Sequence, residues 1–190
     1  MKKMLLISAV VFALGCQLFA APPAAWFKGK VSPQLITSGG KKVPASVLQG
    51  KMVAFYFSAH WCPPCRSFTP QLAKFYRKVS RKHNLEIVFV SSDRDAKAMA
   101  EYMKQMPWLA IPHNSPQAAA LRKEFKINGI PTLVVVDSKG RTVTTNGRTD
   151  VMKQGTKAVD SWKKGSGKKP SVKGKKSSSK SKNIKVKKGK

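Results

Sequence analysis

The chain contains a strand without a polar face, and a helix begins almost directly after it. Met52 to Phe57 is a continuous apolar and aromatic run of strand length, which suits a central strand covered on both faces. Beyond Pro63 and Pro64, apolar residues recur at helical spacing, at Phe68, Leu72, Phe75 and Tyr76. This order of elements predicts an α/β domain.

Strand and helix signals go on alternating between about Lys30 and Ser161. The further predicted elements are strands over 85–90, 132–136 and 141–145 and helices over about 99–106, 115–125 and 150–163. The turn at 137–140 joins two neighbouring strands into an antiparallel hairpin. Alternating helices and strands closed by a hairpin predict a three-layer α/β/α domain with a mixed central sheet.

A cysteine pair lies at the corner between the first of these strands and its helix, in Trp61-Cys62-Pro63-Pro64-Cys65-Arg66. Cys62 falls at the helix N-cap, where free N–H groups and the helix dipole favour an anion. In such motifs the cysteine pKa typically falls to about 3.5–7.5. The pattern predicts an accessible Cys62 thiolate that attacks and a more buried Cys65 that resolves. The two prolines occupy the first turn, where missing N–H donors cost nothing, and they stiffen the loop.

Other chemistries for these cysteines have less support. A structural zinc site usually needs a second C-x-x-C pair or nearby histidines, and this chain has one pair. A structural disulfide would not need the strand-to-helix corner beside Trp61. A Cys–His hydrolase could use His60, His83 or His113, but nothing in the spacing selects one. Without a G-x-G-x-x-G sequence opening a helix, we expect no flavin, nicotinamide or other cofactor, and no metal.

A proline stands just ahead of the hairpin, in Gly129-Ile130-Pro131-Thr132. On the residues alone this is an ordinary loop proline at the start of a strand, because only about 5–6% of X–Pro bonds in folded proteins are cis.

Several motifs in order resemble the thioredoxin superfamily, and in particular its tryparedoxin and nucleoredoxin branch. They lie within about residues 45–148 and are the segments 55–60, 61–66, 68–70, 90–93, 106–112 and 130–132. The resemblance implies a thioredoxin-like domain over 45–162, preceded by an extension over 22–44.

The resemblance also implies roles for individual residues. Cys62 would be the nucleophile and Cys65 the resolving thiol. A cis Ile130–Pro131 bond would face them, exclude metal and bind an extended substrate segment. Trp61 would cover one side of the site, with Trp108 and Ile130 bordering it. Pro63, Pro64 and Arg66 would support the motif.

One position departs from many thioredoxins, which carry a buried, proton-relaying carboxylate six residues before the nucleophile. Tyr56 stands there in this chain, as in the tryparedoxin-like branch. Glu101 or a water would have to replace the carboxylate, and the sequence does not decide between them.

The N-terminus resembles an export signal over residues 1–21. Lys2 and Lys3 precede an 11-residue apolar stretch that as a helix spans about 16 Å, too short for the roughly 30 Å hydrocarbon core. Small residues follow at Ala20 and Ala21, where cleavage is expected. Cys16 ends a sequence similar to a lipobox and is either an acylation site or part of a discarded leader. We therefore expect a periplasmic or cell-envelope protein, soluble or lipid-anchored.

The other end is strongly basic and lies within a chain of net charge +29. Residues 163–190 contain 13 Lys and no acid, a composition that predicts disorder. Such a tail either binds an anionic membrane or polymer surface through charge, or only improves solubility.

Together these features predict an exported, monomeric thiol–disulfide oxidoreductase, in the first place a protein-disulfide reductase. Its partners would be disulfide-containing proteins and an upstream thiol donor. The alternatives are a disulfide oxidase or isomerase, and an adaptor that acts only through its basic tail.

Overall fold

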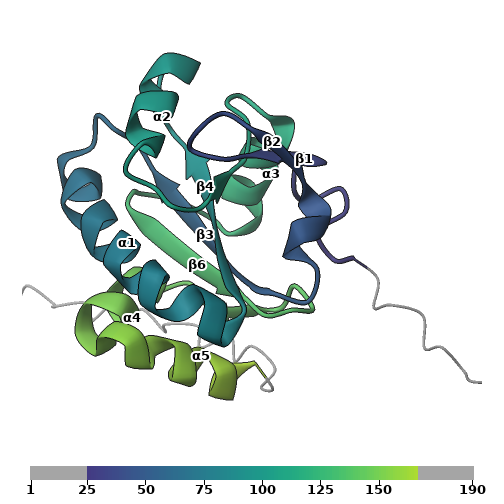
Figure 1. The fold of residues 1–190 in the computed structure, drawn as a ribbon, viewed down its shortest axis with the longest axis vertical. Helices are drawn as coiled ribbons and strands as arrows, with labels where there is room; N and C mark the ends of the chain where they lie inside the picture. Colours follow the sequence, from purple (N-terminus) through teal and green to yellow (C-terminus); the bar gives the residue numbers. More distant parts are fainter. Residues whose placement is uncertain (1–24, 167–190) are drawn as a thin grey trace, which may run out of the picture.

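The computed structural model describes residues 25–166, which form one mixed sheet with helices on both faces (Figure 1). Its strands are β1 (Gln34–Ile36), β2 (Lys42–Pro44), β3 (Met52–Ser58), β4 (Leu85–Ser91), β5 (Leu109–Ala110), β6 (Thr132–Val136) and β7 (Thr142–Thr144). The α-helices are α1 (Pro63–His83), α2 (Ala96–Met103), α3 (Pro116–Glu124), α4 (Gly147–Gln154) and α5 (Ala158–Gly165), with 3-10 turns η1 (Ala45–Leu48) and η2 (Gly155–Lys157). The strand order is β2-β1-β5-β4-β3-β6-β7. This confirms the predicted three-layer α/β/α fold.

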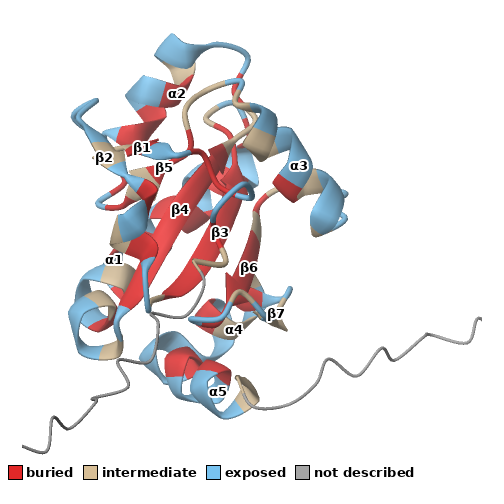
Figure 2. Cartoon of the chain, turned by 90° about the vertical axis from the view of Figure 1, so that its right-hand side faces the viewer, coloured by how far each residue is buried: buried red, intermediate tan, exposed pale blue. Residues whose placement is uncertain are grey.

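The sheet is centred on β3, which is paired on both edges. It runs parallel to β4 and antiparallel to β6, and every residue from Met52 to Ser58 is buried. Successive side chains of a strand point to opposite faces. Tyr56 therefore packs in one core with α1, whereas Phe55 and Phe57 pack in the other with the region of α3. Figure 2 shows β3 and β4 as the buried centre of the molecule.

The two cores lie on opposite sides of the sheet. The first contains buried side chains of α1, α2, α4 and α5, including Phe68, Leu72, Met99, Val151 and Trp162. The second is closed by α3, η1 and the segment before β1. The predicted apolar stripe of α1 is confirmed, since Phe68, Leu72 and Phe75 are buried and Tyr76 is partly buried.

The predicted domain boundary at residue 45 is wrong, because earlier residues belong to the second core. Phe27, Val31 and Leu35 are each at most 4% exposed. Strand β1 also pairs with β2 and, through Ile36, with β5. Strands of three residues are too short to give a periodic signal, so the sequence pattern did not separate this edge from an extension.

The last predicted helix, from about Asp150 to Lys163, is interrupted. Helix α4 begins earlier, at Gly147, and ends before Gly155, whose φ of 55° leaves the right-handed helical region. Helix α5 then carries Trp162 into the core and includes Lys163 and Lys164 in its last turn. At least three residues of the predicted disordered tail, 163–165, are therefore helical.

Several predictions fall outside the described residues. These are the export signal over 1–21, the acylation of Cys16 and the segment 167–190 of the basic tail. Within residues 25–166, no helix combines the length and apolarity needed to span a bilayer.

Candidate active site

Cys62 occupies the N-cap of α1, as predicted. Its backbone is extended, with φ −89° and ψ 109°, and its Sγ accepts a hydrogen bond of 3.3 Å from the backbone N–H of Cys65. Pro63 and Pro64 fill the first two helical positions, and no acidic side chain lies in the first turn. An uncompensated helix N-terminus stabilises a negative charge at the cap. This position favours the thiolate form of Cys62 once the pair is reduced.

Cys62 and Cys65 are joined by a disulfide, with their Cα atoms 5.2 Å apart. Cys65 is fully buried and Cys62 is 4% exposed. The order of accessibility is the expected one, but in this disulfide state Cys62 is not the open residue that the sequence predicted. The reason is that its disulfide partner Cys65 and one neighbouring loop lie against its sulfur.

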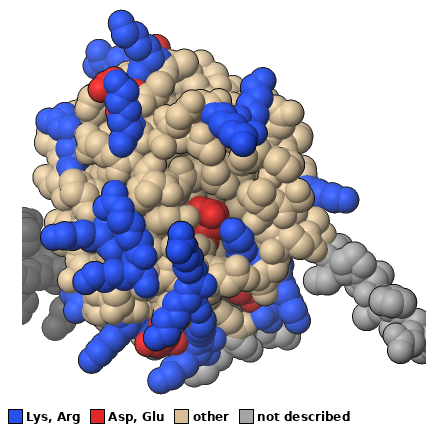
Figure 3. All heavy atoms as spheres, viewed as in Figure 1, with Lys and Arg blue, Asp and Glu red and all other residues tan. Residues whose placement is uncertain are grey.

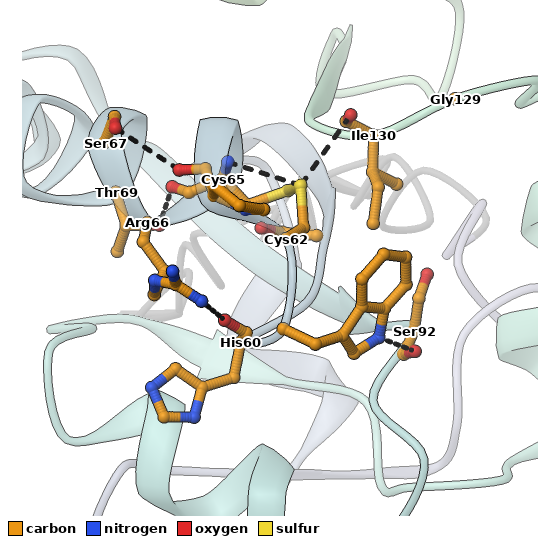
Figure 4. The surroundings of a disulfide bond; sticks show 12 residues. His60, Cys62, Cys65, Arg66, Ser67, Thr69, Ser92, Gly129 and Ile130 are labelled. Carbon is orange, nitrogen blue, oxygen red and sulfur yellow. Dashed lines mark hydrogen bonds between the residues drawn. A yellow bond between two sulfur atoms is a disulfide. The ribbon is translucent and has the colours of Figure 1, made fainter.

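This loop carries Gly129 and Ile130 (Figure 4) and continues to Pro131. The Ile130–Pro131 peptide bond is cis, as the resemblance implied and against the estimate from the residues alone. The carbonyl oxygen of Ile130 lies 3.9 Å from Cys62 Sγ. Thr132 secures the loop by donating a 2.7 Å hydrogen bond to the carbonyl of Gly129. Backbone polar groups thus stand directly beside the sulfur atom, on the side opposite α1.

Trp61 and Arg66 connect the cysteine loop to its surroundings. Trp61 is 53% exposed, and its indole Nε1 donates a 3.0 Å hydrogen bond to the carbonyl of Ser92, beyond the end of β4. Arg66 Nη1 donates to the carbonyl of His60, at 2.8 Å. His60 in turn donates its backbone N–H to Asp93 Oδ1, at 2.7 Å. The loop is therefore fixed to the neighbouring strand end. Trp61 presents an exposed ring directly before Cys62 in the chain, and its role as a cover of the site stays a prediction.

A network of buried hydroxyl groups lies behind Cys65. Thr69 Oγ1 donates to the Cys65 carbonyl at 3.0 Å and contacts the hydroxyls of Tyr56 at 2.9 Å and Tyr102 at 2.5 Å. Ser58 Oγ donates to the Tyr56 hydroxyl at 2.9 Å and lies 3.1 Å from that of Tyr102. Ser58, Thr69 and Tyr102 were not predicted from the sequence. A signal for two of them was a hydroxyl residue two places after Tyr56 and another one helical turn after Cys65.

This network defines what Tyr56 can do in place of the missing carboxylate. Burial raises the pKa of Tyr56 well above its ordinary value of 10.0, so near neutral pH the phenol keeps its proton and acts as a hydrogen-bond partner. Glu101, the other candidate, is exposed on α2 and pairs with Lys104 at 2.6 Å. It is therefore no buried proton relay.

Trp108 does not border the open side of the site. It is 2% exposed and packs edge-on against Tyr56 and Tyr76, at ring-centroid distances of 6.1 and 5.7 Å. Its connection to the cysteines runs through Tyr56, whose hydroxyl lies 3.4 Å from the Cys65 carbonyl. Trp108 supports the site from inside the core.

The ligand groups of a metal centre do not come together in the described part of the chain, where no three His, Cys, Asp or Glu side chains cluster. The surface beside the disulfide instead offers an open hollow of about 360 Å³. Trp61, His60, Arg66 and Arg94 are among the residues that line it. It lies beside Trp61, the residue before Cys62, and is also lined by Asp93 and Asp95; neither cysteine is among its lining residues.

Comparison with known proteins agrees with this geometry. A family model described as thioredoxin-like matches residues 50–142. Probable nucleoredoxin 1 of Arabidopsis thaliana is 48% identical over 120 residues, which cover 63% of this chain and 21% of the relative. Human nucleoredoxin is 41% identical over 128 residues, covering 66% and 29%. The chain thus spans only about a fifth to a third of these relatives.

Solved structures match over nearly their whole length. Tryparedoxin I from Crithidia fasciculata is 41% identical with a TM-score of 0.65, covering 69% of this chain and 93% of that one. Tryparedoxin II in complex with glutathionylspermidine is 38% identical with a TM-score of 0.66, covering 70% and 94%. Fold and disulfide together define a thioredoxin-like redox protein. The chain belongs to the tryparedoxin and nucleoredoxin branch of the thioredoxin superfamily.

Proposed function

We propose that this protein is a protein-disulfide reductase that works through Cys62 and Cys65. The observation that carries the proposal is the placement of Cys62 Sγ between the helix N-terminus and the carbonyl of Ile130. The first stabilises the thiolate. The second belongs to a backbone segment on which an extended substrate chain can form hydrogen bonds.

The reaction transfers two electrons from the dithiol to a substrate disulfide. The Cys62 thiolate attacks one substrate sulfur, the substrate S–S bond breaks, and the departing sulfur takes up a proton. Cys65 then loses its proton and attacks Cys62 Sγ in the mixed disulfide. The second substrate thiol leaves, and Cys62 and Cys65 form the disulfide seen here. An external thiol donor must reduce this disulfide before the next turnover.

Substitution of each cysteine tests the assignment of roles. With insulin as substrate and dithiothreitol as donor, Cys62→Ser is expected to be inactive. Cys65→Ser is expected to accumulate a mixed disulfide with the substrate, detected by mass spectrometry. Turnover by Cys62→Ser at the rate of the unmodified protein, or trapping by Cys62→Ser instead of Cys65→Ser, would refute the mechanism.

The direction of exchange separates reductase from oxidase or isomerase, because the chemistry itself is reversible. The relatives favour reduction. Equilibration of the Cys62–Cys65 pair with glutathione buffers gives its potential. A value near that of thioredoxin, about −270 mV, supports a reductase, and a value near about −120 mV supports an oxidase.

The charge of the chain bears on its electron donor. Residues 25–166 contain 24 Lys or Arg and 8 Asp or Glu. The hollow beside Trp61 is itself balanced in charge, since Arg66 and Arg94 line it together with Asp93 and Asp95, so the relevant excess of cations is that of residues 25–166 as a whole. One relative binds glutathionylspermidine, which carries a cationic polyamine. We propose that this chain instead accepts electrons from a neutral or anionic thiol. Faster reduction by glutathionylspermidine than by glutathione at low salt would contradict this.

We further propose that the protein acts as a monomer in the periplasm or cell envelope. The support is the leader over 1–21, with Cys16 as an acylation site or part of the discarded leader, and the Lys-rich segment 163–190, which would attach to an anionic surface. Mass spectrometry of the native N-terminus distinguishes cleavage after Ala20 from acylation at Cys16. An intact leader on the native protein would refute export by this route.

A further inference from the structure

Helix α1 has an unusual distribution of charge. It contains six Lys or Arg residues and no Asp or Glu. Five of the six form an exposed stripe at spacings of three and four residues, which places them on one side of the helix. We call this the α1 stripe; its members are Lys74, Arg77, Lys78, Arg81 and Lys82.

The α1 stripe is not neutralised inside the described part of the protein. The four ion pairs found there join Lys30 to Glu124, Lys51 to Glu86, Lys104 to Glu101 and Arg141 to Asp137. Favourable interaction with the helix dipole can account for cations in the last turn, at Arg81 and Lys82, but it fades within one turn. Lys74, Arg77 and Lys78 lie further from the C-terminus of the helix, so its dipole does not account for them. Figure 3 shows Lys and Arg side chains gathered over the side of the molecule that α1 occupies in Figure 1.

The surface beside the stripe is hollowed and contains an exposed apolar side chain. A hollow of about 360 Å³ between α1 and the α4–η2 segment is lined by Lys74, Lys78, Lys157 and Met152, among others. Met152 is 55% exposed, and the only other large apolar side chain so exposed within residues 25–166 is Trp61, at the disulfide. On the other side of the stripe, a hollow of about 470 Å³ includes Arg77 and Arg81 with the carboxylate of Glu86, which Tyr76 and Lys51 already engage.

Cations around an exposed apolar side chain match the chemistry of an anionic bilayer surface. Lys and Arg gain energy from anionic headgroups, while an apolar side chain enters the boundary between headgroups and acyl chains. A nucleic acid would use the cations but has no counterpart for Met152. The aromatic rings that line these hollows, Tyr76 and Phe75, already pack edge-on against Trp108 and Trp162, and Phe75 is only 5% exposed, so neither is a free platform for base stacking. The described chain also ends at Ser166, just after α5 in the same layer, and residues 167–190 bring eleven further Lys and no acid.

We propose that the α1 stripe and Met152 form a docking surface for an anionic phospholipid bilayer, distinct from the Lys-rich segment that follows α5. Lys74 lies twelve residues beyond Cys62, about 18 Å along the helix at 1.5 Å per residue. A bilayer seated on the stripe therefore leaves the cysteine loop uncovered for protein substrates. The docking does not depend on the redox reaction, so a protein without an active dithiol would still bind.

Vesicle sedimentation of the complete chain tests this surface. Binding to vesicles of phosphatidylcholine alone gives the baseline, including any contribution of the leader, and vesicles with equal parts of phosphatidylglycerol give the specific signal at low and high salt. The stripe variant replaces four of its cations by Gln, at Lys74, Lys78, Arg81 and Lys82. The control variant makes the same change in net charge elsewhere, at the exposed residues Lys41, Lys42, Lys123 and Lys139.

The stripe variant is expected to lose far more affinity than the control. Each cation near an anionic membrane contributes about fivefold, so the loss of four corresponds to on the order of 100-fold or more. The control variant should change by less than about threefold, because its cations lie outside the docking surface. Thermal unfolding of both variants confirms that they are folded. Equal losses in the two variants, or no preference of the unmodified chain for phosphatidylglycerol, would overturn the proposal.

Met152→Gln distinguishes a bilayer from a soluble polyanion without changing the charge. It should weaken binding to phosphatidylglycerol vesicles severalfold and leave binding to duplex DNA unchanged. If it weakens neither, or if the stripe variant loses DNA binding while vesicle binding persists, the surface is not a membrane-docking site.

Discussion

Replacing Tyr56 by Phe removes one hydroxyl from the network behind Cys65, and its effect can be worked out bond by bond. That hydroxyl makes two contacts of 2.9 Å, with Ser58 and Thr69, and a longer one of 3.4 Å with the Cys65 carbonyl. After the substitution Ser58 still has Tyr102, and Thr69 still has Tyr102 and the Cys65 carbonyl. No remaining group is left without a partner.

The expected cost is therefore that of ordinary net hydrogen bonds, about 1–2 kcal/mol in the free energy of unfolding. For a domain of this size the melting temperature should fall by about 3–8 °C. Turnover should change by less than about threefold. Because burial raises the pKa of Tyr56, the phenol keeps its proton throughout the reaction near neutral pH and cannot accept the proton of Cys65.

Tyr76→Phe is the matched control, since it removes a phenol hydroxyl that donates a 2.8 Å hydrogen bond to Glu86, away from the cysteines. Both variants are compared by chemical denaturation and by insulin reduction between pH 6 and about pH 9, a range that brackets the usual cysteine pKa. A loss of turnover on the order of 100-fold in Tyr56→Phe alone would show that Tyr56 relays the proton. An unchanged free energy of unfolding would show that the network does not stabilise the fold.

Three further measurements test the packing, the electrostatics and the cover of the site. Gly147→Ala should lower the free energy of unfolding by about 1–3 kcal/mol, because its new Cβ would lie 2.8 Å from the Leu133 carbonyl oxygen. The control Gly165→Ala meets only a side chain, at 3.3 Å, and should cost less than about 1 kcal/mol. Urea denaturation measures both. Tyr56 has a raised pKa in the folded state, so its contribution to stability should be constant below about pH 10 and fall above it, by up to about 1.4 kcal/mol per pH unit. Because the pKa of Tyr76 is raised as well, Tyr56→Phe should lessen the alkaline fall without abolishing it; an equal alkaline fall in Tyr56→Phe would exclude this residue as a cause. Trp61→Ala should change the melting temperature by less than about 2 °C, because the ring is 53% exposed. It should raise the KM for insulin severalfold without slowing exchange with dithiothreitol. An unchanged KM would refute the role of Trp61 at the substrate surface.

The central elements could be predicted because each leaves a periodic signal in a continuous segment. Met52 to Phe57 has the length and apolarity of a buried strand, and the structure buries all of it. The apolar face of helix α1 from Phe68 to Tyr76 repeats over two turns and packs as expected. The edge strands β1 and β2 were not predicted, for the opposite reason. They have three residues each, and their burial depends on pairing across the sheet, which leaves no pattern in the local sequence.

The site divides in the same way. Cys62 and Cys65 are three residues apart, so the sequence itself dictates their proximity, and the helix start assigns their roles. Ser58, Thr69 and Tyr102 come from β3, α1 and α2 and meet only in the folded protein. Each is unremarkable where it stands in the sequence. Trp108 was misplaced because a motif shared with relatives reveals that a residue matters without revealing whether it faces the substrate or the core.

The absence of acidic residues from α1 has an effect at each end of the helix. Asp and Glu are favoured in the first turn of a helix because they compensate its dipole. Here the first turn has none, so the partial positive charge remains available to the Cys62 thiolate. Twelve residues later the same absence leaves Lys74 and the rest of the α1 stripe unpaired. One feature of composition therefore supports both proposals, yet they remain separable: within α1 the dithiol depends on the first turn, and membrane docking depends on the cations of the fourth turn onward.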